Sequence, residues 1–350
     1  MAPFLVAIFL LGLSSLATAA NFKQVFGWNE LDYEWPSEAS RTLALKNGTF
    51  KPENIDPRFM AVYGSRLFLS LNKDDGIPVT LVSMPTSSAS SAAPKLTPFP
   101  SWEMNGHGDC SKIQQAKGLQ VDSVGRLWML HQGSDTCKSN LWIFNLKNNQ
   151  TELIHPLSFP GWVQDLVIDE TPNGTFAYIT RWWFEKGFLV FSLEKNESWI
   201  VDMPEVDAYS IALSPKKLYF SAFSSRKLYS ISVASIRNGT RTANPELIGN
   251  WTARSYRMLI DSHGTMYTAF TWKDYMSSWN SLQPFHEQRV YQVAGLDIVR
   301  PFTFSLDQNG NLWMTVFDNK RNPKYRLLKA AVGAKSPECG TSCHKNETAA

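Results

Sequence analysis

Residues 119–146 read LQVDSVGRLWMLHQGSDTCKSNLWIFNL, and the first half of this stretch is a pattern that recurs along the chain. An apolar pair leads into an acidic residue and a turn with glycine, and a leucine-aromatic pair follows inside an alternating run. Residues 121–128 (VDSVGRLW) have close counterparts at 260–267 (IDSHGTMY) and 306–313 (LDQNGNLW). Weaker copies lie at 60–69, 166–179 and 211–220. The chain therefore carries six copies of one phrase.

Each copy is typical of a β-hairpin. Runs such as 127–130 (LWML) and 141–144 (LWIF) are rich in branched and aromatic residues and are too short for helices, while Asp and Gly between runs supply tight turns. The aromatic residues of the second runs are Phe68, Trp128, Tyr178, Tyr219, Tyr267 and Trp313, spaced by 41 to 60 residues. That spacing is about one four-stranded propeller blade. A β-sandwich also has short strands, but six copies favour a ring, so we predict an all-β, single-domain, six-bladed β-propeller.

The two ends of the chain set the expected domain limits. Residues 1–19 hold an apolar stretch and then small residues, which is typical of a signal peptide and too short for a membrane span. We expect the propeller over residues 20–335, with an outer strand near Trp28 closing the ring, and a polar C-terminal tail over 336–350.

Composition narrows the classes of partner. The chain has 350 residues with 43% hydrophobic content, enough for a large core, and 34 basic against 31 acidic residues. No basic run is interleaved with aromatic residues, so nucleic acid is not an expected partner, and no later segment is apolar enough to enter a membrane. The oligomeric state stays open.

Sequons and cysteines fit an exported protein. An even number of cysteines favours disulfides, and we expect Cys110 to pair with Cys137, with Cys339 and Cys343 able to bridge locally. Their spacing fits no zinc template, and we predict no metal and no cofactor. Seven Asn-x-Ser/Thr sequons predict glycosylation at Asn47, Asn149, Asn173, Asn196, Asn238, Asn250 and Asn346.

Aromatic residues cluster just after the second strands and just before the inner strands. In a propeller these segments meet at one mouth of the central channel, and an aromatic funnel with a few polar groups is typical of a small-ligand site. Ring faces also hold cationic amines. The alternative is that the rings pack between blades. The candidate ligand-binding residues are Tyr209, Phe270, Phe302, Phe317, Asn319 and Trp182.

Several phrases in chain order resemble the Yellow and major royal jelly protein family of arthropods. They include 28–33 (WNELDY), 76–81 (GIPVTL), 122–130 (DSVGRLWML) and 211–215 (IALSP). The resemblance implies a secreted six-bladed propeller, but not one activity, since members are linked to cuticle pigmentation, dopachrome conversion, nutrition and capture of biogenic amines.

The amine-binding members of that family use three positions that this sequence keeps only in part. Their aromatic position corresponds to Tyr209, which is retained. Their Thr and Asn positions align with Phe302 and Phe317, so the polar half of the site is missing or rearranged unless Thr303 or Asn319 substitutes.

We therefore expect a secreted glycoprotein that binds a small aromatic or biogenic-amine ligand at the channel mouth. No nucleophile-elbow or zinc-protease motif occurs, which favours a non-catalytic protein. The alternatives are a melanin-pathway enzyme that converts dopachrome in cuticle pigmentation, and a structural or nutritive extracellular protein. Such an enzyme needs a proton acceptor, for which His131 and Asp165 are the candidates.

Overall fold

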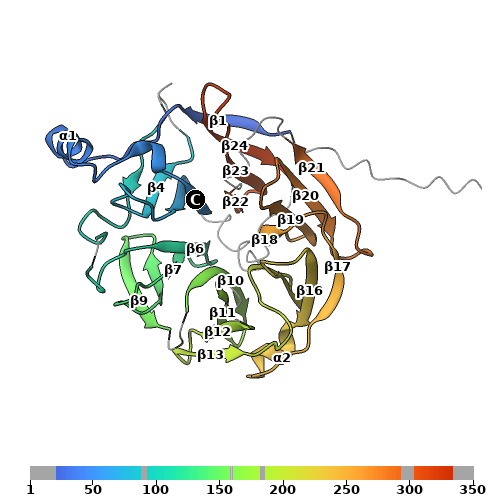
Figure 1. Ribbon diagram of the computed structural model, residues 1–350. Coiled ribbons are helices and arrows are strands. Elements are labelled where there is room, and N and C mark those ends of the chain that lie inside the picture. The colour runs from blue at the N-terminus through green and yellow to red at the C-terminus, as the bar shows by residue number, and fades with distance from the viewer. Residues whose placement is uncertain are drawn as a thin grey trace, which may run out of the picture.

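A computed structural model describes residues 21–87, 93–106, 108–157, 159, 161–181, 186–292 and 303–333. Over these residues the chain forms six four-stranded antiparallel sheets arranged as blades around a central axis (Figure 1). The predicted all-β, six-bladed propeller is confirmed. The predicted signal peptide and C-terminal tail lie outside the described residues, as do Cys339, Cys343 and Asn346.

Five blades are built from consecutive strands, ordered from the axis outward. Blade 1 consists of β2 (Pro57–Tyr63), β3 (Arg66–Leu71), β4 (Leu81–Pro85) and β5 (Thr97–Pro98). Blade 2 consists of β6 (Ala116–Val121), β7 (Arg126–His131), β8 (Asn140–Asn145) and β9 (Gln150–Pro156). Blade 3 consists of β10 (Val163–Thr171), β11 (Gly174–Arg181), β12 (Phe188–Ser192) and β13 (Glu197–Val201).

The second half of the ring repeats this order. Blade 4 consists of β14 (Ser210–Leu213), β15 (Lys217–Ser221), β16 (Lys227–Ser232) and β17 (Glu246–Asn250). Blade 5 consists of β18 (Ser255–Ile260), β19 (Thr265–Phe270), β20 (Tyr275–Asn280) and β21 (Gln288–Gln292). Blade 6 consists of β22 (Thr303–Leu306), β23 (Asn311–Phe317), β24 (Tyr325–Ala331) and β1 (Lys23–Trp28). The helical elements are α1 (Glu38–Lys46), η1 (Pro52–Asn54) and α2 (Val233–Arg237).

Blade 6 closes the ring by joining the two ends of the described chain. Its outer strand β1 pairs antiparallel with β24, with Trp28 opposite Tyr325 and Lys23 opposite Lys329. In Figure 1 the blue β1 runs along the outer edge of the red-brown β24. The pairing gives the edge of β24 a partner, which an open sheet would lack. The predicted closing strand is confirmed.

The recurring phrase has a physical cause in the turn between the first and second strands. Asp122 ends up buried beside the turn, where its Oδ1 accepts the backbone N–H of Arg126 at 2.8 Å and its Oδ2 accepts the indole N–H of Trp128 at 2.9 Å. One carboxylate therefore fixes both the turn and the aromatic side chain of the next strand. The same bond joins Asp307 to Trp313 (2.8 Å) and Asp261 to Tyr267 (3.3 Å).

The cores lie between neighbouring blades, where apolar side chains from both sheets interdigitate. Trp128, for example, is fully buried in a cluster that joins blades 2 and 3. The inner strands β2, β6, β10, β14, β18 and β22 each pair on one side only, so their other edges surround the axis. The channel is consequently bordered by these strands and by the side chains at their ends.

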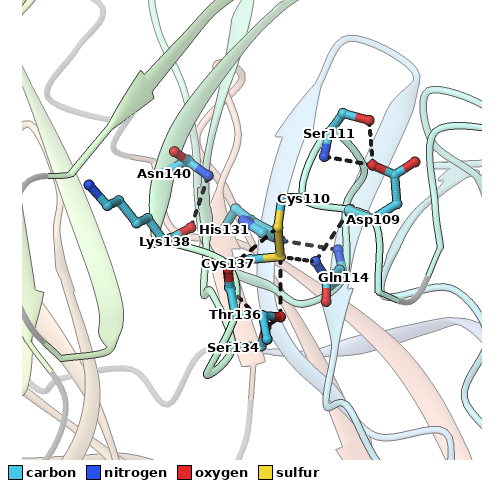
Figure 2. The surroundings of a disulfide bond; sticks show 10 residues. All are labelled: Asp109, Cys110, Ser111, Gln114, His131, Ser134, Thr136, Cys137, Lys138 and Asn140. Carbon is cyan, nitrogen blue, oxygen red and sulfur yellow. Dashed lines mark hydrogen bonds between the residues drawn. A yellow bond between two sulfur atoms is a disulfide. The ribbon is translucent and has the colours of Figure 1, made fainter.

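A disulfide joins Cys110 to Cys137, with an S–S distance of 2.01 Å, which confirms the predicted pair (Figure 2). It ties the segment that precedes β6 to the connection between β7 and β8. The side-chain amide of Gln114 donates to Sγ of Cys137 at 3.0 Å, and its backbone N–H donates to Nε2 of His131 at 3.1 Å. The bridge thus belongs to a bonded cluster at one end of blade 2.

Candidate functional site

Two cavities lie along the channel within the described part of the chain. The mouth cavity, of about 560 Å³, is at the end where the inner strands begin, and it takes residues from blades 1, 2, 3 and 5. The opposite cavity, of about 750 Å³, is at the end where the inner strands turn into the second strands. The mouth cavity includes Arg58, Phe59, Lys117, Gln132, Gln164 and Tyr256.

A layer of side chains separates the two cavities. Arg257 of β18 pairs with Asp165 of β10 at 3.2 Å, and its guanidinium lies 4.9 Å from the ring centre of Phe59 on β2. Burial raises the pKa of the Asp165 carboxyl, although Arg257 acts to lower it. Gln164 and Tyr256 border the mouth cavity, whereas the residues that follow them border the opposite one. We call Asp165, Arg257 and Phe59 the partition.

Aromatic rings form one side of the mouth cavity. The rings of Phe59 and Tyr256 stack at 6.4 Å with 27° between their planes. Behind them Tyr209 packs edge-on against Tyr256 at 6.3 Å and against Phe223 at 4.8 Å. Trp162 stands at the cavity with 47% of its surface exposed. Aromatic rings therefore make up part of the lining, and Trp162 is the most exposed of them, as in many small-ligand sites.

Tyr209, the aromatic residue singled out in the sequence, contacts the mouth cavity only through residues that line it. Its side chain is 3% exposed, and it is not among the residues that line the mouth cavity. Its hydroxyl accepts a hydrogen bond of 3.2 Å from the Nε2 atom of Gln164, which does line the cavity. Burial raises the pKa of Tyr209 well above its ordinary value, so the hydroxyl stays protonated. The tyrosine orients the amide of Gln164.

Among the polar residues that line the mouth cavity, Gln132 and Gln164 lie in segments that the sequence places at the channel mouth, whereas Arg58 and Lys117 were missed. Arg58 pairs with Asp56 at 2.6 Å, and Lys117 is only 7% exposed. Burial, together with the nearby Arg58, lowers the pKa of Lys117 to about 8. The Oε1 atoms of Gln132 and Gln164 are buried and have no hydrogen-bond partner among the described residues. The sequence signal for Arg58 and Lys117 was a charged residue within an otherwise apolar inner strand, in β2 and in β6 respectively.

The other sequence-predicted ligand residues occupy different positions. Phe270 is fully buried between Trp251 and Tyr275, at ring distances of 5.9 and 5.4 Å. Phe317 packs 4.7 Å from Tyr325, and Asn319 is exposed in the β23–β24 connection. None of these three lines the mouth cavity. Trp182 and Phe302 lie outside the described residues.

Neither candidate proton acceptor faces the mouth cavity. His131 has no exposed surface, and its Nε2 accepts the N–H of Gln114 beside the disulfide (Figure 2). Its ring packs against Trp142. Burial lowers the pKa of His131 to about 4. Asp165 lies in the partition and is paired with Arg257. Sequence spacing did not distinguish these two residues, and the fold places both away from the lining of the mouth cavity.

Two further observations concern the described residues as a whole. No three side chains of His, Cys, Asp or Glu converge there as ligands of a metal ion would. No helix in the same part of the chain is long and apolar enough to cross a membrane.

Comparison with known sequences gives one consistent group of relatives. A sequence model of the family described as Major royal jelly protein matches residues 114–210 and 205–326. Protein yellow of Drosophila guanche is 25% identical over 350 aligned positions, covering 85% of this chain and 61% of that protein. Protein yellow of Drosophila melanogaster is 24% identical, covering 85% of this chain and 64% of that protein. The chain thus spans less than two thirds of the length of these relatives.

Comparison with solved structures identifies the fold. Regucalcin, a calcium-binding protein from Agrobacterium tumefaciens, has a TM-score of 0.54 at 14% identity, covering 80% of this chain and 91% of that one. A gluconolactonase from Xanthomonas campestris has a TM-score of 0.54 at 10% identity, covering 88% of this chain and 99% of that one. At such identities the similarity concerns the propeller alone.

Proposed function

Because this chain belongs to the major royal jelly protein family, we propose that it is a secreted, Yellow-type glycoprotein that binds a small aromatic ligand in the mouth cavity. Biogenic amines and other ring compounds of similar size are the candidates. The family alone does not specify an activity, so the proposal depends on the residues of the cavity.

One observation carries the proposal: two residues that line the cavity, Gln132 and Gln164, have buried amide oxygens without donors in the described part of the chain, and aromatic rings belong to the same lining. Oε1 of Gln132 and Oε1 of Gln164 have no donor among the described residues. A buried acceptor without a donor costs about 1–3 kcal/mol, so a ligand O–H or N–H that reaches these atoms gains that amount. The Tyr209 hydroxyl accepts from Nε2 of Gln164, which leaves the amide oxygen for a ligand.

The size and surface of the cavity support the same ligand class. A volume of about 560 Å³ lies within the usual range for small-molecule sites, roughly 300–1,000 Å³. Tyr256 and Phe59 present rings, and an aromatic pair contributes about 0.5–1.5 kcal/mol beyond its buried area. A planar ring bearing hydroxyl or amine groups would use both the rings and the amides.

Export and glycosylation rest on the sequence and on the exposure of the sequons. The apolar N-terminal stretch supports secretion, and a disulfide is typical of an oxidising compartment. Asn149 and Asn196 lie in turns with positive φ angles of 60° and 49°. The sequon asparagines in the described residues are all exposed, at Asn47, Asn149, Asn173, Asn196, Asn238 and Asn250.

Calorimetric titration of the secreted protein with serotonin, dopamine and 5-hydroxyindole tests the proposal. We expect saturable binding to the wild-type protein, and about tenfold weaker binding to Gln132→Leu because one acceptor is lost. Gln283→Leu, at an exposed position, is the matched control and should bind as the wild type does. Equal affinities for Gln132→Leu and the wild type would contradict the proposed site.

Dopachrome absorbance, followed in parallel, tests the pigmentation enzyme as the alternative. Accelerated loss of dopachrome would replace the binding proposal with a catalytic one. No heat with any ligand and no absorbance change would favour a structural or nutritive protein.

A further inference from the structure

The mouth cavity carries an excess of positive charge among its buried and partly buried residues. Arg58 is 24% exposed at its side chain and Lys117 is 7% exposed, and both line the cavity. Asp56, which pairs with Arg58 at 2.6 Å, is 5% exposed. One buried cation, Lys117, and one partly buried cation, Arg58, thus stand against one buried carboxylate, Asp56. Asp56 itself does not line the cavity, and the carboxylate that does, Asp135, is exposed.

Burial decides which of these charges a ligand feels. Asp135 is exposed to solvent. In water, two charges about 4 Å apart interact by about 1 kcal/mol, and salt weakens that interaction further. Lys117 and Arg58 lie where the effective dielectric constant is several times lower, so their fields are correspondingly stronger. A cationic amine placed among them is repelled, and an anion is attracted.

A donor without an acceptor points to the same conclusion. Nε of Arg58 is buried and has no acceptor among the described residues, although the guanidinium already pairs with Asp56. Arginine donors in a fixed fork match the geometry of a carboxylate, and the lysine ammonium adds a point charge beside it. The cavity therefore combines two basic donors with two amide acceptors, at Gln132 and Gln164.

Building on the proposed function, we propose that the ligand of the mouth cavity is a small aromatic acid: its carboxylate is received by Lys117 and Arg58, its ring lies against Tyr256 and Phe59, and its hydroxyl or ring N–H donates to Gln132 or Gln164. Such a ligand carries the same kind of aromatic ring as a biogenic amine but the opposite charge. The aromatic surface would therefore serve either class, and only the basic residues separate them.

The protonation of Lys117 gives the proposal a pH signature. The groups that act on this ammonium are Arg58 and Asp56 from the β2 side and Asp74 from the β3–β4 connection, while Asp135 and Tyr256 border the same cavity. Because the pKa of Lys117 is about 8, the free protein carries this charge at pH 7 and has largely lost it by pH 9. Affinity for an acid should fall across that interval, and affinity for an uncharged ring compound should not.

Ligand pairs that share a ring and differ in charge provide the decisive experiment. Serotonin is compared with 5-hydroxyindole-3-acetic acid, and dopamine with 3,4-dihydroxyphenylacetic acid, by calorimetry at pH 7 on the full secreted protein. We expect each acid to bind at least about tenfold more tightly than its amine. Tighter binding of the amines would overturn the charge assignment and leave the proposed function standing. Absence of binding by either class would instead remove the proposed function.

Substitution of Lys117 tests the residue itself. Lys117→Met keeps the length of the side chain and should reduce the preference for acids to near parity, whereas Lys138→Met, at an exposed lysine in the β7–β8 connection, should keep it. An unchanged preference in folded Lys117→Met would overturn the assignment. If Lys117→Met does not fold, the pH series on the wild-type protein decides: acid affinity that is constant from pH 7 to pH 9 contradicts the proposal, with 5-hydroxyindole as the uncharged reference.

Discussion

Gly118 lies directly against the backbone of Asp165: a Cβ added to Gly118 would stand 2.8 Å from Cα of Asp165 and 3.0 Å from the backbone nitrogen of Leu166. The two residues belong to β6 and β10, the inner strands of neighbouring blades. Asp165 is also the residue that pairs with Arg257 in the partition. The absence of a side chain at Gly118 therefore sets how closely two blades approach, and with it the position of the partition.

Gly118→Ala should destabilise the protein by about 1–3 kcal/mol, because backbone atoms cannot move aside as a flexible side chain can. The urea midpoint measures the effect at constant slope. Gly106→Ala is the matched control, since an added Cβ there would meet only the Lys112 side chain, at 3.1 Å. Equal midpoints for the two variants would show that the blades separate easily.

Asp122→Ala should cost about 2–3 kcal/mol, because it leaves the buried indole N–H of Trp128 and the N–H of Arg126 without their acceptor. Thermal unfolding followed by tryptophan fluorescence reports the loss. Asp135→Ala, which removes an exposed carboxylate from the same blade, should stay within about 0.5 kcal/mol of the wild type. A similar small effect for both would mean that the phrase does not stabilise its hairpin.

His131 should make stability depend on pH. Its pKa is about 4 in the folded protein against 6.5 ordinarily, so the unfolded chain binds the extra proton between these values. Stability should therefore fall as the pH drops from 6.5 towards 4, by up to about 3 kcal/mol, with no further loss from this group below pH 4. His131→Gln should flatten that slope, while His286→Gln, at an exposed position, should not. Urea titrations at each pH measure it.

Replacing both Cys110 and Cys137 with Ala should destabilise the protein by about 3–4 kcal/mol, because the bridge closes a loop with a sequence separation of 27 residues in the unfolded chain. Calorimetric melting of the oxidised wild type, the reduced wild type and the variant is the measurement. The reduced wild type should match the variant. Equal melting temperatures for all three samples would show that the disulfide does not stabilise the folded protein.

Tyr209→Phe should weaken ligand binding about threefold to tenfold while keeping the ring packing, since it removes the hydroxyl that accepts from Nε2 of Gln164. Tyr209→Ala would also delete a ring packed against Phe223 and Tyr256, and would confuse loss of binding with loss of folding. Calorimetry with the tightest ligand, alongside circular dichroism, separates the two. Unchanged affinity in Tyr209→Phe would show that Gln164 needs no support.

The ring could be predicted because its repeating unit is local. The phrase that places Trp128 six residues after Asp122 is written in consecutive residues, and the carboxylate-to-indole bond explains why those residue types recur. All six aromatic residues matched in the sequence lie on the second strands of their blades. The closing strand near Trp28 was predictable because the last edge of a ring needs a partner strand. The pair of Cys110 with Cys137 was predictable because these two cysteines bracket one hairpin.

The lining of the mouth cavity could not be predicted in the same way. The sequence does not show whether a ring at the channel end of a strand faces the channel or the next blade. Phe270, at the end of β19, and Tyr209, just before β14, were therefore equal candidates. In the fold Tyr209 contacts the lining residue Gln164, whereas Phe270 packs between Trp251 and Tyr275. Arg58 and Lys117 come from different blades, and only the closed ring brings them together.

The pairing of β1 with β24 also constrains the order of events in biosynthesis. Among the strands of the described residues, β1 leaves the ribosome first and its partner β24 (Tyr325–Ala331) leaves it last. Until β24 has been synthesised, residues 23–28 therefore lack the strand with which they pair. A nascent chain that ends before β24 would leave β1 without its partner, and unpaired strand edges favour pairing between chains and aggregation.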